Sequence, residues 1–213
     1  LQLAFLRPDD PHSIVNAMDE YQSMMDAIRI GLTHPIVSEV PTDPAERSRH
    51  MKAFGYFSDA SMVGTAILPA AARLKTPYRN AGIDRLAEDL RTKQVSTLAS
   101  GIEVIMADLR ETMEAAPTTI EAHTHAIVFL YEYPRDPAAD EPGTAWINDA
   151  QAQRASLRAN EAAAVIGNYF RKLGFDARSH SESTSDVDLN RLAVAAGLCV
   201  FEDGRLINPY LGD

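Results

Sequence analysis

The sequence predicts a mixed α/β fold, an α+β sandwich in which helices flank a central mixed sheet. Amphipathic stretches of helical period are separated by short apolar runs of strand type, which is the pattern of such folds. The chain has 213 residues, of which 46% are hydrophobic and 23% charged, values typical of a globular domain with a substantial core. We expect one domain over 1–213, with a helical N-terminal extension over 1–58 and a sheet-containing core over 59–213.

Two helices and a strand are expected in the first third of the chain. The first helix is capped by Ser13 and ends near Gly31. Apolar and small residues recur in it at helical spacing, namely Ile14, Ala17, Met18, Tyr21, Met24, Met25 and Ile28. The Pro-punctuated loop THPIVSEVPTDP precedes a second helix at about Ala45 to Phe57. The run ASMVGTAIL, Ala60 to Leu68, predicts a buried strand.

Helices and two further strands are expected in the remainder. The middle is mostly helical in pattern, from about Ile83 to Ala116. The apolar run Ala126 to Tyr131 predicts a strand, and a loop rich in Pro, Asp and Gly follows it. The longest helix is expected from about Trp146 to Leu173, with Gly174 as its C-terminal cap. A strand at Asp176 to His180 follows.

The chain is expected to end with a helix and an extended tail. The helix is capped by Ser185 or Asp186 and runs through Ala196. The tail after it includes Leu-Ile-Asn-Pro. We find no internal repeat and no low-complexity segment.

Two stretches near the end resemble one enzyme family. They are NYFRKLGFDARSH (Asn168 to His180) and LNRLAVAAGLCVFEDGRLINPYLG (Leu189 to Gly212). They predict a helix that ends in Lys-Leu-Gly-Phe, a short strand, a second helix that ends in Ala-Ala-Gly-Leu and an extended Leu-Ile-Asn-Pro tail. This order of elements resembles the end of the corrinoid-holding domain in cobalamin-dependent reductive dehalogenases and the related epoxyqueuosine reductases. Fainter similarity to the opening of that domain and to its second strand lies in MKAFGYFSDASMVGTAIL and HAIVFLYEYP. The resemblance implies a nitroreductase-like central mixed sheet.

The charge balance argues against two classes of partner. Twenty Lys and Arg residues against 30 Asp and Glu residues give a formal net charge of −10. Nucleic acids and anionic membranes both select for clustered basic residues. No apolar run approaches the roughly 18 residues of a membrane helix, and the opening LQLAFLRPDD lacks the pattern of a signal peptide. We therefore expect a cytoplasmic protein that binds neither nucleic acid nor membrane.

The chain has one cysteine, Cys199. It permits no disulfide within the chain, which fits a reducing compartment. An iron–sulfur cluster needs about four thiolates, so this chain cannot hold one alone, and any electron must come from another polypeptide or from a segment outside this sequence. As a nucleophile, Cys199 would need a His or Lys partner that lowers its pKa. The sequence identifies none, which favours a buried structural thiol.

The resemblance implies that the cofactor-binding residues are Gly197, Leu198, Cys199 and Arg205. Family members usually place glycines where this chain has Cys199 and Glu202, and glycine allows a turn with positive φ to approach a ligand closely. Cys199 adds a side chain at that approach. Arg205 has a position similar to the basic residue that polarises the substrate or product in dehalogenases. The alternative interpretation of Arg205 is a solvated loop arginine.

The same resemblance implies a tyrosine proton donor, but no tyrosine lies in the expected region, Pro134 to Asn168. Trp146 is the aromatic residue there, and an indole cannot deliver a proton at neutral pH. Tyr131 and Tyr133 are the nearest substitutes, and their positions are more typical of core and edge aromatics. We therefore expect no catalytic residue in this chain.

Two groups of polar residues are candidate ligand sites. His123 and His125 form a His-x-His pair that would place both imidazoles on one face of a strand. A metal site needs a third ligand, and no HExxH or CxxC spacing supplies one, so a half-exposed strand is favoured and no metal is expected. The cluster HSESTSDVD, His180 to Asp188, is explained by a helix N-cap with an acidic first turn.

Three features lead to a hypothesis about function: the absence of cluster cysteines, the missing tyrosine and the altered glycine turn. They match the degenerate, cofactor-free copy of the domain that precedes the working copy in some members of the family. The first hypothesis is therefore the non-catalytic N-terminal module of a reductive dehalogenase, with the catalytic and iron–sulfur-containing part as its partner. The enzyme would replace a carbon–halogen bond by carbon–hydrogen, with cobalamin cobalt supplying the chemistry.

Two other hypotheses remain open. One is a stand-alone corrinoid-binding or corrinoid-trafficking protein, whose pocket would be lined by the tail from Ala196 to Gly212. The other is an α/β interaction domain with chance similarity in its helix ends.

Overall fold

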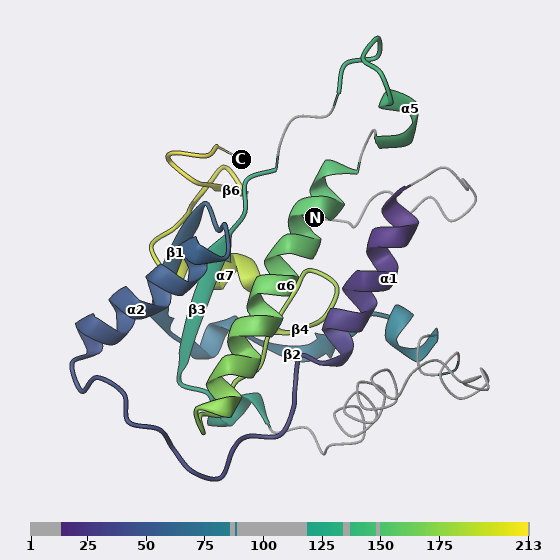
Figure 1. Cartoon of the computed structure of the whole chain (residues 1–213). Helices are drawn as coiled ribbons and strands as arrows, with labels where there is room; N and C mark the ends of the chain where they lie inside the picture. Colours follow the sequence, from purple (N-terminus) through teal and green to yellow (C-terminus); the bar gives the residue numbers. More distant parts are fainter. Residues whose placement is uncertain (1–13, 86–87, 89–118, 134–136, 148–149, 213) are drawn as a thin grey trace.

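A computed structural model describes residues 14–85, 88, 119–133, 137–147 and 150–212. Within them, the strands pair antiparallel in three two-stranded sheets (Figure 1). The pairs are β1 (Met62–Ile67) with β3 (His125–Leu130), β2 (Arg73–Tyr78) with β4 (Ser185–Val187), and β5 (Val200–Glu202) with β6 (Arg205–Ile207). The predicted α+β class is confirmed. One central mixed sheet was expected, but the described residues form small antiparallel sheets.

The helices lie on both sides of the β1–β3 ribbon (Figure 1). They are α1 (Ile14–Ala27), α2 (Pro44–Phe57), the short α5 (Thr144–Ile147), α6 (Gln151–Lys172) and α7 (Leu189–Ala195), with single 3₁₀ turns η1 (Ala70–Ala72) and η2 (Ile120–Ala122). None of the helices in the described residues is both long and apolar enough to cross a membrane. Most of the predicted helical stretch Ile83 to Ala116, and the predicted cap Ser13, lie outside the described residues.

The β1–β3 ribbon has a helix close against each face, and two glycines allow this. Val63 and Phe129 are cross-strand partners, and both contact Gly55 of α2, where an added Cβ would lie 2.4 Å from Val63 and 2.9 Å from Phe129. A Cβ on Gly64 would lie 2.8 Å from the Cβ of Ala196, directly after α7. Because neighbouring side chains of a strand point to opposite faces, the ribbon separates α2 from α7.

The hydrophobic core is built around α7. Its Leu192 packs in a cluster whose other buried members are Leu68, Ala72 and Val187. The adjacent Ala193 packs in a second cluster with Leu198 and Cys199. Short α7 therefore joins the strands β1, β3 and β4 to the C-terminal tail.

The long helix begins later than predicted. Residues from Trp146 to Leu173 were expected to be one helix, but α5 ends at Ile147 and α6 begins at Gln151. The end was predicted to within one residue, since α6 ends at Lys172 and Gly174 follows the C-cap residue Leu173 with φ +85. An added Cβ there would lie 2.4 Å from the carbonyl oxygen of Ile36, so both the left-handed backbone and the close approach favour glycine.

The strand predicted at Asp176 to His180 is not formed. The backbone N–H of Ser179 instead donates to the carbonyl of Arg29, at 3.1 Å, and the strand β4 begins at Ser185. The predicted caps Ser185 and Asp186 are therefore strand residues. The cap of α7 is Asp188, whose side chain accepts a hydrogen bond from the Arg191 N–H at 3.0 Å.

Candidate functional site

The C-terminal tail, where the corrinoid site was predicted, forms a β-hairpin. Its turn residues Asp203 and Gly204 have φ values of 49 and 79, and two successive positive φ angles are typical of the type I′ turn that joins tight hairpins. Glu202 and Arg205 pair across the hairpin directly before and after this turn. Arg205 is consequently exposed at the hairpin end.

The four residues predicted to bind the cofactor lie in two different environments. Gly197 and Arg205 are exposed, and Gly197 has φ +70 with no atom within 4 Å of an added Cβ. Leu198 and Cys199 are 5% and 6% exposed, and both side chains pack against Ala193 in the core. The second pair therefore presents no side chain to a ligand on the tail surface.

Asn208 closes the tail upon itself. Its Nδ2 donates to the carbonyl oxygen of Leu198 at 2.6 Å, and its Oδ1 accepts from the backbone N–H groups of Tyr210 and Leu211, both at 2.8 Å. The carbonyl at Leu198 and the N–H groups of the turn are therefore already used within the protein. Of the four predicted residues, Leu198 and Cys199 thus have their side chains in the core, whereas Gly197 and Arg205 are exposed.

Cys199 is a buried free thiol. Burial raises its pKa, and a hydrogen bond with Asn208 offsets this only in part. Since a thiolate is the nucleophilic form, this environment favours the inert, structural role that the sequence indicated.

The two tyrosines considered as proton donors, Tyr131 and Tyr133, lie in different environments. The Tyr131 hydroxyl donates to the carbonyl of Ser58 at 2.5 Å, and the Arg158 guanidinium lies 5.6 Å from the centre of its ring. Burial raises the Tyr131 pKa in spite of the nearby Arg158, which makes the phenol a weaker acid. Tyr133 is exposed. The side chain of Trp146 lies outside the described residues.

The His-x-His pair does not act as a unit. His123 is largely buried, with Nε2 3.5 Å from Oδ2 of Asp176, whereas His125 is exposed and its Nδ1 lies 2.8 Å from the Thr124 hydroxyl. No cluster of three or more His, Cys, Asp or Glu side chains suited to a metal is found among the described residues.

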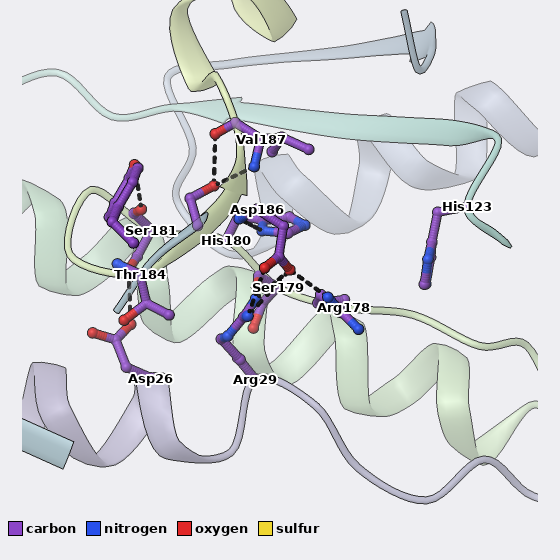
Figure 2. A network of polar contacts seen from close by, with 12 residues as sticks. Asp26, Arg29, His123, Arg178, Ser179, His180, Ser181, Thr184, Asp186 and Val187 are labelled. Carbon is purple, nitrogen blue, oxygen red and sulfur yellow. Dashed lines mark hydrogen bonds and ion pairs between the residues drawn. The ribbon is translucent and has the colours of Figure 1, made fainter. Parts of the chain in front are cut away.

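Figure 2 shows a buried polar network that sequence reasoning missed. Asp186 accepts three hydrogen bonds from Arg29, whose Nη1 lies 3.0 Å from Oδ2 and whose Nη2 lies 3.1 Å from each oxygen. It accepts one more from Arg178. Burial alone would raise the Asp186 pKa, but these hydrogen bonds outweigh burial and hold the pKa below its ordinary value. The carboxylate is therefore ionised and paired.

His180 lies against this ion pair. Its Nδ1 accepts from the backbone N–H of Asp186 at 3.3 Å. Burial, assisted by the charges of Arg29 and Arg178, lowers the His180 pKa to about 3. The imidazole is consequently neutral at physiological pH and serves as an acceptor.

A second buried carboxylate, Asp26, is held without a cation. Both of its oxygens accept two hydrogen bonds. The donors are Nδ2 of Asn80 at 2.9 Å and of Asn160 at 2.8 Å, and the hydroxyls of Ser181 at 2.7 Å and Ser183 at 2.5 Å. Four donors fill the acceptor capacity of a carboxylate, so Asp26 has no free lone pair for general base catalysis. Its hydrogen bonds instead hold α1 against α6 and the segment after β2.

Solved structures similar to this chain include reductive dehalogenases. The N-terminally tagged catabolic reductive dehalogenase NpRdhA is 32% identical, with a TM-score of 0.67 over 95% of this chain and 23% of its own. Its complex with 3-bromo-4-hydroxybenzoic acid has a TM-score of 0.68 over the same shares. A further structure, described as suggesting a mechanism for B12-dependent dehalogenation, is 31% identical, with a TM-score of 0.68 over 98% of this chain and 23% of its own.

These matches confirm the predicted resemblance at the level of fold and structural neighbours. The chain corresponds to less than a quarter of each neighbour's length, because the matched share is 23% in every case. No protein-family model and no curated protein matches the chain.

Proposed function

We propose that this chain is a non-catalytic module of a B12-dependent reductive dehalogenase, packed against the catalytic and iron–sulfur-containing part of that enzyme. The observation that carries the proposal is the match to reductive dehalogenases, which covers 95–98% of this chain but 23% of theirs. The whole chain thus resembles one part of a longer enzyme. We assign it to the degenerate N-terminal half and take its scaffold as nitroreductase-like.

The chemistry of the described side chains supports a non-catalytic role. The chain has one cysteine, so thiolates for an iron–sulfur cluster must come from elsewhere. Tyr131 has a raised pKa, and its hydroxyl is bonded to a backbone carbonyl. Electron supply and proton delivery are therefore assigned to the partner part.

The tail supports a module that binds no corrinoid. Asn208 occupies the Leu198 carbonyl and the Tyr210 N–H, and the Cys199 side chain fills the core. A corrinoid at this surface would have to displace these contacts. The role of the module in the enzyme would be to support the shape of the working half.

A titration of the purified chain with hydroxocobalamin tests the proposal. Visible absorbance and calorimetry should show no binding, while circular dichroism shows that the chain is folded. A corrinoid-binding dehalogenase serves as the positive control. Stoichiometric binding at micromolar concentration or tighter would overturn the proposal and establish the alternative, a stand-alone corrinoid-binding or trafficking protein.

A second experiment tests the partner. Coexpression with the iron–sulfur-containing part of the same enzyme, produced as a separate polypeptide, should give a 1:1 complex in size-exclusion chromatography with light scattering. Two separate, folded species would contradict the proposed packing.

A further inference from the structure

Helix α2 buries little of its own surface. It packs on the β1–β3 ribbon through Gly55, and of its 14 residues, all of them described, Gly55 alone is buried. A helix of this length is marginal in water, and its stability in a protein comes mostly from packing against other elements. Phe57, the last residue of α2, is 87% exposed. The outer side of α2 is therefore a candidate for a further contact.

Two contacts join α2 to the long helix α6. The rings of Phe54 and Tyr169 meet edge to face, with their centroids 5.2 Å apart. Asp59, just after α2, forms an ion pair of 3.2 Å with Arg158 of α6. The end of α2 and the outer side of α6 therefore lie side by side.

Two exposed apolar side chains lie between these contacts. Phe57 follows the first contact and precedes the second along the chain. On α6, Val165 falls on the same stripe as Arg158 and Tyr169, because successive residues turn by about 100°. Val165 and Tyr169 are both exposed. These two residues and Phe57 thus form one apolar area that extends over both helices.

The loop before α2 extends this area at the end of α6. The N–H of Ser38 donates to the carbonyl of Leu173 at 2.8 Å, and Leu173 follows Tyr169 by about one helical turn. Ile36 and Val37 of this loop are both exposed. The name α2–α6 surface is used below for five exposed side chains, namely Ile36, Val37, Phe57, Val165 and Tyr169.

Polar and charged residues flank the α2–α6 surface. His50 on α2 and Glu161 and Lys172 on α6 are exposed. An apolar centre with aromatic residues and a polar rim is typical of an interface with another folded protein. The formal net charge of −10 argues against an anionic membrane as the occupant. The surface is therefore suited to a protein partner.

The length of the similar dehalogenases indicates which protein that is. The matches cover 95–98% of this chain but 23% of each neighbour, so most of each neighbour's polypeptide lies outside the match. Parts of one longer chain pack against each other through interfaces that resemble those between proteins. The remainder of such an enzyme is the natural occupant of an apolar surface on this chain.

We propose that the α2–α6 surface docks on the catalytic and iron–sulfur-containing part of the dehalogenase, with Phe57 and Val165 at the centre of the contact. This inference rests on the proposed function, which supplies the partner but not the surface. The complementary surface of the partner is apolar, because Tyr169 alone brings a polar side-chain atom to the α2–α6 surface.

Calorimetric titration of surface variants tests the docking, with the partner part produced as a separate polypeptide. The double substitution Phe57→Glu and Val165→Glu should weaken binding at least about tenfold, as expected for changes at the centre of an interface. Circular dichroism shows that the variant is folded. The exposure of Phe57 makes a folding defect an unsuitable explanation for lost binding.

A matched control adds the same charge on the other side of the ribbon. Phe201→Glu with Tyr210→Glu changes two residues of the tail that are 52% and 83% exposed, against 60% for Val165 and 87% for Phe57. The tail packs with α7, on the face of the β1–β3 ribbon opposite to α2. This control should bind the partner as the unsubstituted chain does.

A thiol footprint locates the contact directly. Cys199 is the one cysteine of the chain and is buried, so an introduced surface cysteine is the accessible thiol. A maleimide should label Phe57→Cys at least about tenfold more slowly in the complex than in the free chain, because the centre of an interface excludes solvent. Tyr210→Cys should be labelled at the same rate in both.

The outcomes separate this inference from the proposed function. Unchanged binding of the Phe57→Glu and Val165→Glu variant, or full labelling of Phe57→Cys in the complex, overturns the docking surface and leaves the proposed function standing. Absence of any complex between the two folded parts overturns both. A dimer of this chain in light scattering that dissociates with Phe57→Glu and Val165→Glu also overturns the inference, because a second copy would then occupy the surface.

Discussion

The Nδ2 atom of Asn208 lies 2.6 Å from the carbonyl oxygen of Leu198, ten residues earlier in the chain. This hydrogen bond joins the end of the tail to the residue that begins it. The Oδ1 atom of the same side chain caps the turn at Tyr210 and Leu211. One buried amide thus holds the hairpin β5–β6 against the second core cluster.

Substituting Asn208 by Ala should destabilise the tail. The change leaves the buried Leu198 carbonyl and the turn N–H groups without partners, and each unsatisfied buried group costs about 1–3 kcal/mol. Urea unfolding should show a loss in this range, and hydrogen exchange should rise in 197–212. Tyr210→Ser, at an exposed position, is the control. Equal effects of both variants would argue against the Asn208 contacts as the cause.

Substituting Asp26 by Ala should be more costly. Four donors from Asn80, Asn160, Ser181 and Ser183 would lose their acceptor in a buried site. The expected loss is about 3–5 kcal/mol, comparable to the breaking of a buried pair. Chemical denaturation measures it, and Asp84→Ala serves as control because the Arg79–Asp84 pair is exposed and worth at most about 1 kcal/mol. A loss below that of the control would show that Asp26 is not an anchor.

The sequence predicted much of the fold because helices and strands have local signals. The helix end at Gly174 follows from the need for a left-handed residue there. The strands β1 and β3 follow from short apolar runs. Their pairing in small antiparallel sheets did not follow, because register depends on contacts between distant residues.

The site was less predictable for the same reason. Asp186 was attributed to a helix cap from its neighbours in sequence, but its partner Arg29 lies 157 positions away. Spacing alone gives no indication of that pair. A signal was present for Asp26, since Gln22, Ser23 and Asp26 share one side of α1. The apolar stripe on the opposite side dominated the pattern.

Two helical glycines should respond oppositely to substitution by Ala. At Gly55 the added Cβ would lie 2.4 Å from Val63, so the ribbon must shift, at a cost of about 1–3 kcal/mol. At Gly167 the nearest atom lies 3.7 Å away, and the gain in helix propensity should stabilise the protein by about 0.5–1 kcal/mol. Thermal unfolding of both variants gives the comparison. A stabilising Gly55→Ala would contradict the close packing of α2 on β1.

The neutral state of His180 should make stability fall in mild acid. Its pKa is lowered from 6.5 to about 3 in the folded protein, so below about pH 6.5 the unfolded chain binds a proton that the folded chain does not. The free energy of unfolding should therefore decrease as the pH falls from about 6.5 towards 3. Urea titrations at several pH values should show a shallower decrease for His180→Asn, which keeps an acceptor for the Asp186 N–H but does not titrate. His125→Asn, at an exposed site, should retain the original slope, and an unchanged slope in His180→Asn would mean that other groups cause the acid sensitivity.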